Sequence, residues 1–183
     1  LRAIGDSLRF DKRLAPFDIQ ASIAHARMLG KQRIIPTKDS AAIVRELTRM
    51  KAQIESGKLV VEGDDEDVHS WIERTLTERI GDAGKKVHTA RSRNDQVATA
   101  FRLWVDHAED QCYDATEALI LALVGRADSV MGIVVPSYTH LQRAQPVLLS
   151  HHLLAHAEFF DRDQANFGFG TPAIGECPLG AGA

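Results

Sequence analysis

The sequence is poor in cysteine and in aromatic residues, and it has no long apolar run. Its 183 residues include two cysteines, and aromatic side chains make up 6%. Two widely spaced cysteines do not make a disulfide framework and are typical of a reducing compartment, so we expect a cytoplasmic protein. No stretch approaches the ~20 consecutive apolar residues of a membrane helix. The first residues lack the basic start and the apolar centre of a signal peptide, so we expect no membrane partner.

An excess of positive charge is also missing. The formal net charge is −3 and the pI is about 6.2, whereas a general affinity for nucleic acid needs a basic face. Nucleic acid is therefore not an expected partner. Hydrophobic residues make up 44% and charged residues 26%, which is enough apolar material for a folded core.

Sustained alternation of apolar and polar residues is absent, and apolar residues instead recur three or four positions apart. This spacing predicts helices. Three short ones are expected over roughly residues 18–30, 40–57 and 67–81, each ended by a glycine.

Longer helices are expected further along the chain. Residues 97–124 contain neither glycine nor proline, and an apolar seam through Phe101, Trp104 and Leu119 suits a neighbouring helix. A second long helix is expected to begin after Pro146. We therefore predict an all-α fold in which a small N-terminal helical domain, residues 1–91, precedes the first part of a long-helix bundle, residues 92–183.

A polar cluster, HTARSRNDQ, occupies residues 88–96, directly before the first long helix. Unpaired N–H groups at a helix start favour an anion, and the guanidinium groups of Arg91 and Arg93 suit carboxylates. Ser92 and Asn94 can add hydrogen bonds. The pattern equally allows an ordinary capped helix start, in which Ser92, Asn94 or Asp95 satisfies the N–H groups and the arginines are solvated.

A second polar cluster, THLQRAQP, occupies residues 139–146. His140 can give or take a proton near neutral pH. Thr139, Gln142 and Gln145 can position a polar substrate, and Arg143 can bind a further carboxylate. By itself the pattern fits as well a helix N-terminal turn with a half-buried histidine.

Other histidines lie outside these clusters. His151, His152 and His156 do not bring the three or four converging ligands and supporting residues of a zinc site, so no metal is expected. Asp67 and His69 place an acid two residues before a histidine at a helix start. Most such pairs are caps or surface hydrogen bonds.

Five runs resemble the argininosuccinate lyases in order and spacing. They are GDSLRFDKRLAPFDIQASIAHA, DDEDVHSWIE, GKKVHTARSRNDQVAT, YTHLQRAQPV and CPLGAGA. The resemblance implies a mostly helical homotetramer of the fumarase/aspartase superfamily, with each active site built from three subunits. It also implies cleavage of the small-molecule substrate argininosuccinate to arginine and fumarate, the last step of arginine biosynthesis, without a metal or organic cofactor.

The resemblance also implies roles for individual residues. The acid/base residue is His140. The substrate-binding residues are Ser7, Arg93, Asn94, Thr139 and Gln142. The residues near the site are Asp67, His69, Arg91, Ser92, Asp95, Arg143 and Gln145.

The sequence departs from this family in several places. A later loop of the type GSSxMPxKxNP, whose serine is the family's other catalytic group, does not occur, and the family's N-terminal arm is incomplete. We therefore expect a fragment. Ala90 stands where a glycine is usual and would resist a positive φ. Glycines in residues 166–175 are expected to interrupt the second long helix.

Two other functions fit the same residues. One is a non-enzymatic structural protein of this fold, as in the lens crystallins that resemble the enzyme. The other is a related lyase acting on adenylosuccinate, aspartate or malate, although RSRNDQ followed by YTHLQRAQP is specific to the argininosuccinate branch.

Because the serine loop is missing, we predict that the 183-residue chain alone lacks lyase activity. The test is the absorbance of fumarate released from argininosuccinate, compared with the His140→Ala variant. Release above that variant would contradict the prediction.

Overall fold

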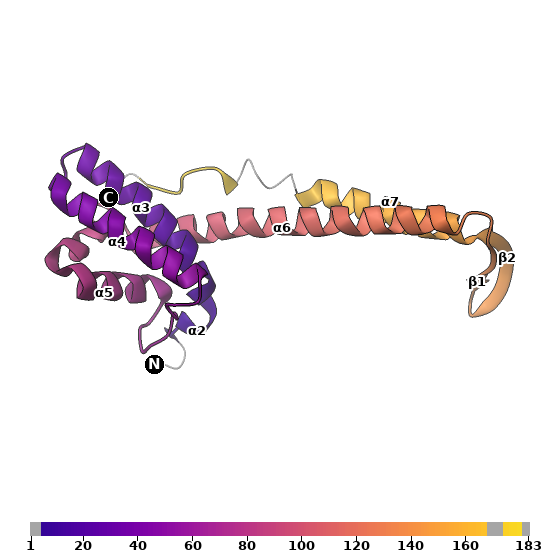
Figure 1. Ribbon diagram of the computed structural model, residues 1–183, viewed down its shortest axis with the longest axis horizontal. Coiled ribbons are helices and arrows are strands. Elements are labelled where there is room, and N and C mark those ends of the chain that lie inside the picture. The colour runs from indigo at the N-terminus through magenta and orange to yellow at the C-terminus, as the bar shows by residue number, and fades with distance from the viewer. Residues whose placement is uncertain (1–4, 168–173, 181–183) are drawn as a thin grey trace. The chain divides into compact units, whose positions relative to one another are not determined.

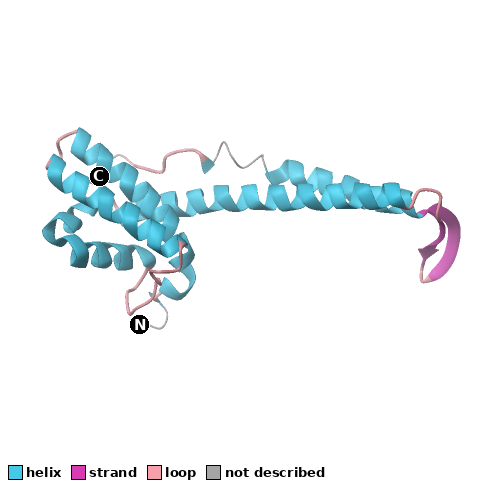
Figure 2. Cartoon of the chain, viewed as in Figure 1, coloured by secondary structure: helices cyan, strands magenta, loops and turns pink. Residues whose placement is uncertain are grey.

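The computed structural model describes residues 5–167 and 174–180. The described chain is mainly helical, with a single pair of strands (Figures 1 and 2). It divides into two compact units, Leu1–Trp104 with Glu176–Ala183, and Val105–Gly175. The predicted all-α class is confirmed, with one small hairpin added. The domain boundary predicted near residue 91 stays a prediction.

The first unit is built from short helices. They are α2 (Leu8–Asp11), the 3-10 helix η1 (Lys12–Leu14), α3 (Ala15–Lys31), α4 (Thr37–Glu55), α5 (Val68–Ile80), the 3-10 helix η2 (Gly81–His88) and the beginning of α6 (Arg93–Ser129). Helix α3 packs most extensively on α4, and α5 lies against both (Figure 1).

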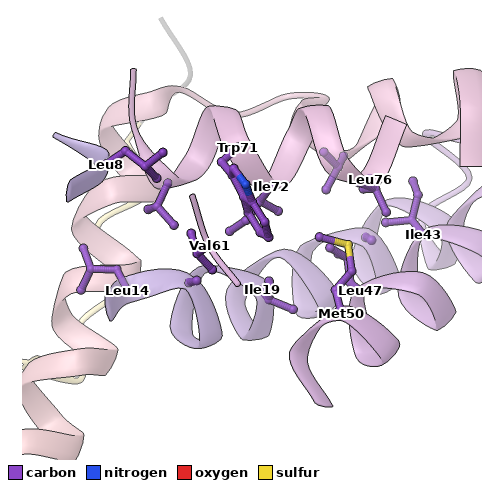
Figure 3. Packing of buried hydrophobic residues seen from close by; sticks show 14 of the residues in the cluster. Leu8, Leu14, Ile19, Ile43, Leu47, Met50, Val61, Trp71, Ile72 and Leu76 are labelled. Carbon is purple, nitrogen blue, oxygen red and sulfur yellow. The ribbon is translucent and has the colours of Figure 1, made fainter. Parts of the chain in front are cut away.

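Apolar side chains from these helices form one core, shown in Figure 3. Ile43, Leu47 and Met50 of α4 are fully buried, as their spacing predicts. Ile72 and Leu76 of α5 face the same core. Burying one such side chain contributes roughly 1.5–3 kcal/mol, so this cluster is the main source of stability in the first unit.

The contact between α3 and α4 depends on Gly30. A Cβ atom at this position would lie 2.4 Å from Ser40 Oγ, and that hydroxyl donates a hydrogen bond of 2.8 Å to the carbonyl of Ala26. Gly30 was predicted to end its helix, but α3 continues to Lys31. Its small size serves the approach of the two helices.

Helix α3 also begins earlier than predicted. The sequence placed its start near Asp18, whereas the helix begins at Ala15, with Pro16 in its first turn, where a missing N–H costs nothing. Asp18 therefore lies within the helix and is buried. Helix α5 begins as expected after Asp67, whose carboxylate accepts a hydrogen bond of 2.6 Å from the N–H of Ser70.

The second unit contains most of α6, the strands β1 (Val134–Thr139) and β2 (Gln142–Leu148), and α7 (Leu149–Phe167). The two strands pair antiparallel. Helix α7 returns along α6: Leu149 N donates to Ile133 O, and Gln164 Nε2 donates to Tyr113 O at 3.2 Å. In Figure 1 the two helices run beside each other.

The hairpin corrects two expectations. Residues 139–146 do not form a helix N-terminal turn, and Val147 and Leu148 belong to β2 instead of the second long helix. That helix begins at Leu149 and runs through Phe167. The expected interruption over residues 166–175 falls largely on residues 168–173, which lie outside the described residues.

The apolar seam of α6 is only partly covered in this chain. Phe101 is 51% exposed and Leu119 is 41% exposed, whereas Trp104 packs on the core of the first unit. Within the described ranges, no helix combines the length and apolarity needed to cross a membrane.

Ala90 has a φ of +59°, so the turn before α6 does demand the left-handed conformation. This costs a non-glycine residue roughly 1–2 kcal/mol. We predict that Ala90→Gly raises the free energy of unfolding by about 0.5–1 kcal/mol, since part of the gain is lost to the greater freedom of glycine in the unfolded chain.

Chemical denaturation of both proteins measures this difference. The matched control is Ala41→Gly on the exposed face of α4, which should lose about 0.5–1 kcal/mol. A loss of stability in Ala90→Gly comparable to that of the control would contradict the prediction.

Candidate active site

The N-terminus of α6 is closed by a reciprocal cap. Ser92 Oγ accepts a hydrogen bond of 3.2 Å from the N–H of Asn94, and Asp95 Oδ2 accepts one of 2.7 Å from the N–H of Ser92. This is a capping box with aspartate in the usual place of glutamate. The capped helix start that the sequence allowed is present. It leaves the side chain of Asn94 exposed beside the positive end of the helix.

Arg91, by contrast, is partly buried. Its Nη2 donates a hydrogen bond of 2.8 Å to Ser22 Oγ, and its buried Nε has no hydrogen-bond partner among the described residues. Burial lowers the pKa of the guanidinium below its ordinary value, against the opposing effect of carboxylates that include Asp18 and Asp95. A buried guanidinium with a free donor favours the approach of an anion.

Arg93 lies close to acidic and polar groups of α5. Its Nη2 donates to Ser70 Oγ at 3.3 Å, and its Nη1 lies 3.4 Å from Glu73 Oε1 and 3.8 Å from Asp67 Oδ1. Nη1 is nevertheless buried without a hydrogen bond in the described structure. Glu73 is shared with His88, whose Nδ1 lies 3.0 Å from Oε1. Arg93 is thus held in place, and its Nη1 lies near two carboxylates without forming a hydrogen bond to either.

The carboxylate of Asp18 is the centre of a buried polar cluster. His69 Nδ1 lies 2.9 Å from Oδ2, and Gln96 Nε2 lies 3.0 Å from both oxygens. Ser22 Oγ donates to Oδ1 at 3.1 Å. Every member of this group is at most 2% exposed. His69 is therefore no surface partner of Asp67, which caps α5 separately.

These hydrogen bonds decide the protonation of Asp18. Burial alone would raise the pKa of the carboxyl, but hydrogen bonds from His69 and Gln96 and the charge of Arg91 hold the pKa below its ordinary 3.8. A lowered pKa means that the folded state favours the ionised form. This contribution to stability is complete above pH 3.8 and is lost as the pH falls through the folded-state pKa.

Ser7 and Asp67 lie at a second polar junction of the first unit. Ser7 Oγ donates to Asp11 Oδ2 at 2.5 Å, and Asp11 Oδ1 accepts from the N–H of Val68 at 3.1 Å. The N–H of Ser7 donates to Glu66 O at 2.7 Å. Asp11 thereby connects Ser7 to the start of α5, where Asp67 and His69 lie.

The second polar cluster forms the tip and arms of the hairpin. Thr139 pairs with Gln142, so the turn has two central residues, His140 and Leu141. Their φ angles are +49° and +63°, as a type I′ turn requires, although such turns usually contain asparagine or glycine. His140 is exposed, not half-buried. Positive φ at two non-glycine residues is local strain, which is found preferentially at functional sites.

The remaining residues of this cluster are also exposed. Tyr138 pairs with Arg143 in the hairpin, and Ser137 Oγ donates to Gln145 O at 2.7 Å. Thr139, Gln142 and Gln145 thus present their side chains to the surroundings. The predicted site residues fall into two groups, eight in the first unit and five on the hairpin.

The structure adds residues that the sequence analysis did not select: Asp18, Ser22, Ser70, Glu73 and Gln96. A signal existed for two of them, because Asp18 and Ser22 are polar residues four positions apart on the apolar stripe of α3. On α7, the rings of His152 and His156 meet edge to face at 4.9 Å. Over the described ranges, no group of His, Cys, Asp and Glu side chains converges to hold a metal ion.

Comparison with known proteins shows the protein family to which the chain belongs. The lyase family matches residues 1–183, so the chain belongs to this family. Solved structures with the same fold include an EDDS lyase in complex with formate, 28% identical, with a TM-score of 0.75 over 93% of this chain and 33% of that one. Another is a fumarate lyase:delta crystallin from Brucella melitensis, 23% identical, with a TM-score of 0.77 over 95% of this chain and 45% of that one.

Two curated relatives of the chain are argininosuccinate lyases. The chain is 47% identical to the argininosuccinate lyase of Sulfurihydrogenibium sp. (strain YO3AOP1) and 49% identical to that of Symbiobacterium thermophilum, over 97% of its own length in each case. It spans 39% and 38% of those two proteins.

The strained turn gives a prediction for the hairpin. Leu141 is 98% exposed, so replacing it with glycine removes strain and loses almost no packing. Leu141→Gly should stabilise the hairpin by about 1 kcal/mol. Slower hydrogen exchange of the hairpin amides would show this.

Leu148→Gly, in strand β2, is the matched control and should accelerate exchange, because glycine weakens an extended strand. Faster exchange in Leu141→Gly as well would show that the turn is not strained.

Proposed function

We propose that this chain is part of an argininosuccinate lyase, which cleaves argininosuccinate to arginine and fumarate. The supporting observation is a pair of buried donors beside the start of α6, Arg91 Nε and Arg93 Nη1, that lack hydrogen-bond partners in the described structure. Buried polar groups without partners are rare in folded proteins. A substrate carboxylate would satisfy these two.

Neighbouring side chains hold both donor-bearing guanidinium groups in place. Arg91 is held by Ser22 and Arg93 by Ser70, so neither guanidinium has to be ordered when the substrate binds. Donors fixed in advance bind a carboxylate at a smaller cost in conformational entropy than donors that must first be ordered. Asn94, exposed at the helix start, is proposed to add a hydrogen bond.

The elimination requires two proton movements. A base removes the proton from the carbon next to a carboxylate, and the freed electron pair forms the C=C bond of fumarate. The C–N bond breaks, and the departing guanidine nitrogen accepts a proton to give arginine. His140 is proposed as one of the two acid/base groups, because its imidazole is exposed at a hairpin tip and imidazole is the side chain most often used for general acid–base catalysis. Thr139 and Gln142 are proposed to contact the substrate beside it.

The complete protein is proposed to be a cytoplasmic homotetramer that acts in arginine biosynthesis. Exposed apolar side chains on α6, such as Phe101 and Leu119, support the packing of further helices there. Residues 1–91 and 92–183 would then be the N-terminal domain and the first part of the bundle. No metal or cofactor is required by the proposed residues.

The test uses the complete protein that contains this chain. His140→Ala should lower kcat for argininosuccinate by about 10²–10⁴-fold, the usual contribution of a general acid or base. Fumarate absorbance gives the rate. His151→Ala, which removes an exposed histidine of α7 outside the proposed site, is the matched control and should retain the rate of the unchanged protein.

Alternative substrates separate the competing functions. Turnover of adenylosuccinate, aspartate or malate in preference to argininosuccinate would assign the chain to another lyase of the superfamily. A folded complete protein that turns over none of these compounds would favour the crystallin-like structural role and reject the proposal.

A further inference from the structure

Asp18 accepts hydrogen bonds from three side chains that belong to three different helices. Ser22 comes from α3 itself, His69 from α5 and Gln96 from α6. His69 and Gln96 are 51 and 78 residues away in sequence. An ionised carboxylate offers acceptors only. Each partner must therefore turn a donor towards it.

Because His69 must turn a donor towards the Asp18 carboxylate, the tautomer of its ring is fixed. Nδ1 faces Asp18 Oδ2 at 2.9 Å, so Nδ1 carries the hydrogen and Nε2 is the nitrogen left without one in the neutral ring. A carboxylate that orients a histidine in this way determines which ring nitrogen can accept a proton or bind another group.

Asp18 influences the orientation of the Arg91 guanidinium through Ser22. A hydroxyl has one hydrogen, and Ser22 donates it to Asp18 Oδ1. Only a lone pair of Ser22 Oγ can then face Arg91, whose Nη2 donates to it at 2.8 Å. This contact directs the guanidinium and leaves Nε as its unused buried donor.

For Gln96 the carboxylate determines the orientation of the amide. Nε2 is directed at both oxygens of Asp18, which leaves Oε1 buried without a hydrogen-bond partner among the described residues. The single carboxylate therefore orients the side chains next to the first turn of α6.

We infer that Asp18 is a positioning residue for the site, which sets the tautomer of His69 and, through Ser22, the direction of the Arg91 guanidinium. The inference rests on the proposed function, because it assigns His69 and Arg91 to that site. Asp18 itself is fully buried and has no part in binding. A purely structural need would not require a charge at this position, since buried ionic groups add little to stability compared with well-packed apolar residues.

A double-mutant cycle in the complete protein separates positioning from support of the fold. Asp18→Asn keeps the size of the side chain and removes its charge. We expect it to lower kcat about 10–100-fold, as loss of an orienting partner usually does. In the background of His69→Asn, the same change should lower kcat by less than about threefold, because the group through which Asp18 acts is already gone.

Two further variants complete the design. Ser22→Ala should raise KM with little change in kcat, because it releases Arg91 and leaves His69 paired. Asp82→Asn removes an exposed aspartate of η2 and should alter neither quantity. Rates are compared at a temperature where thermal unfolding shows every variant to be folded. Multiplicative effects of Asp18→Asn and His69→Asn on kcat would overturn the inference.

The tautomer itself can be measured without any variant or any activity. In nitrogen-15 NMR spectra of the 183-residue chain, the neutral ring of His69 should carry its hydrogen on Nδ1. A hydrogen on Nε2 would overturn the inference even if the variants fail to fold. Because this result needs no turnover, failure of the proposed function and failure of the positioning role remain distinguishable.

Discussion

The buried carboxylate of Asp18 is the interaction on which the orientation of His69, Gln96 and, through Ser22, Arg91 depends. A buried charge is tolerated only where donors surround it. Here the donors come from α3, α5 and the first turn of α6. The apolar core brings these helices together, and the carboxylate then determines how their polar side chains are turned.

The cap at the start of α6 does not involve the neighbouring arginines, Arg91 and Arg93. Ser92 and Asp95 satisfy the helix terminus reciprocally, so the helix start needs no ligand of its own. Arg91 and Arg93 are nevertheless held with one buried donor each to spare. The proposed function thus assigns stability and binding to different atoms of the same short segment. This separation allows the helix to form before any substrate is present.

The helices of the first unit could be predicted because the apolar spacing that defines them also forms the core. Ile43, Leu47 and Met50 are buried as their three- and four-residue intervals indicate. The hairpin was not predicted, because its turn residues, His140 and Leu141, lack the asparagine–glycine pair that usually marks a type I′ turn. Its strands also show no alternation of buried and exposed positions, because none of their residues is fully buried.

The polar cluster around Asp18 could not be read from local sequence, since its partners are tens of positions away and only tertiary packing unites them. An aspartate on an apolar stripe resembles a helix start, and Asp67 two residues before His69 resembles its natural partner. In the structure each aspartate has a different task. The two arginines are not simply solvated, because each donates a hydrogen bond to a serine, Arg91 to Ser22 and Arg93 to Ser70.

The most direct measurement is a crystal structure of the complete protein with fumarate bound. The account predicts one fumarate in contact with the guanidinium groups of both Arg91 and Arg93. Fumarate bound away from these two groups would contradict it.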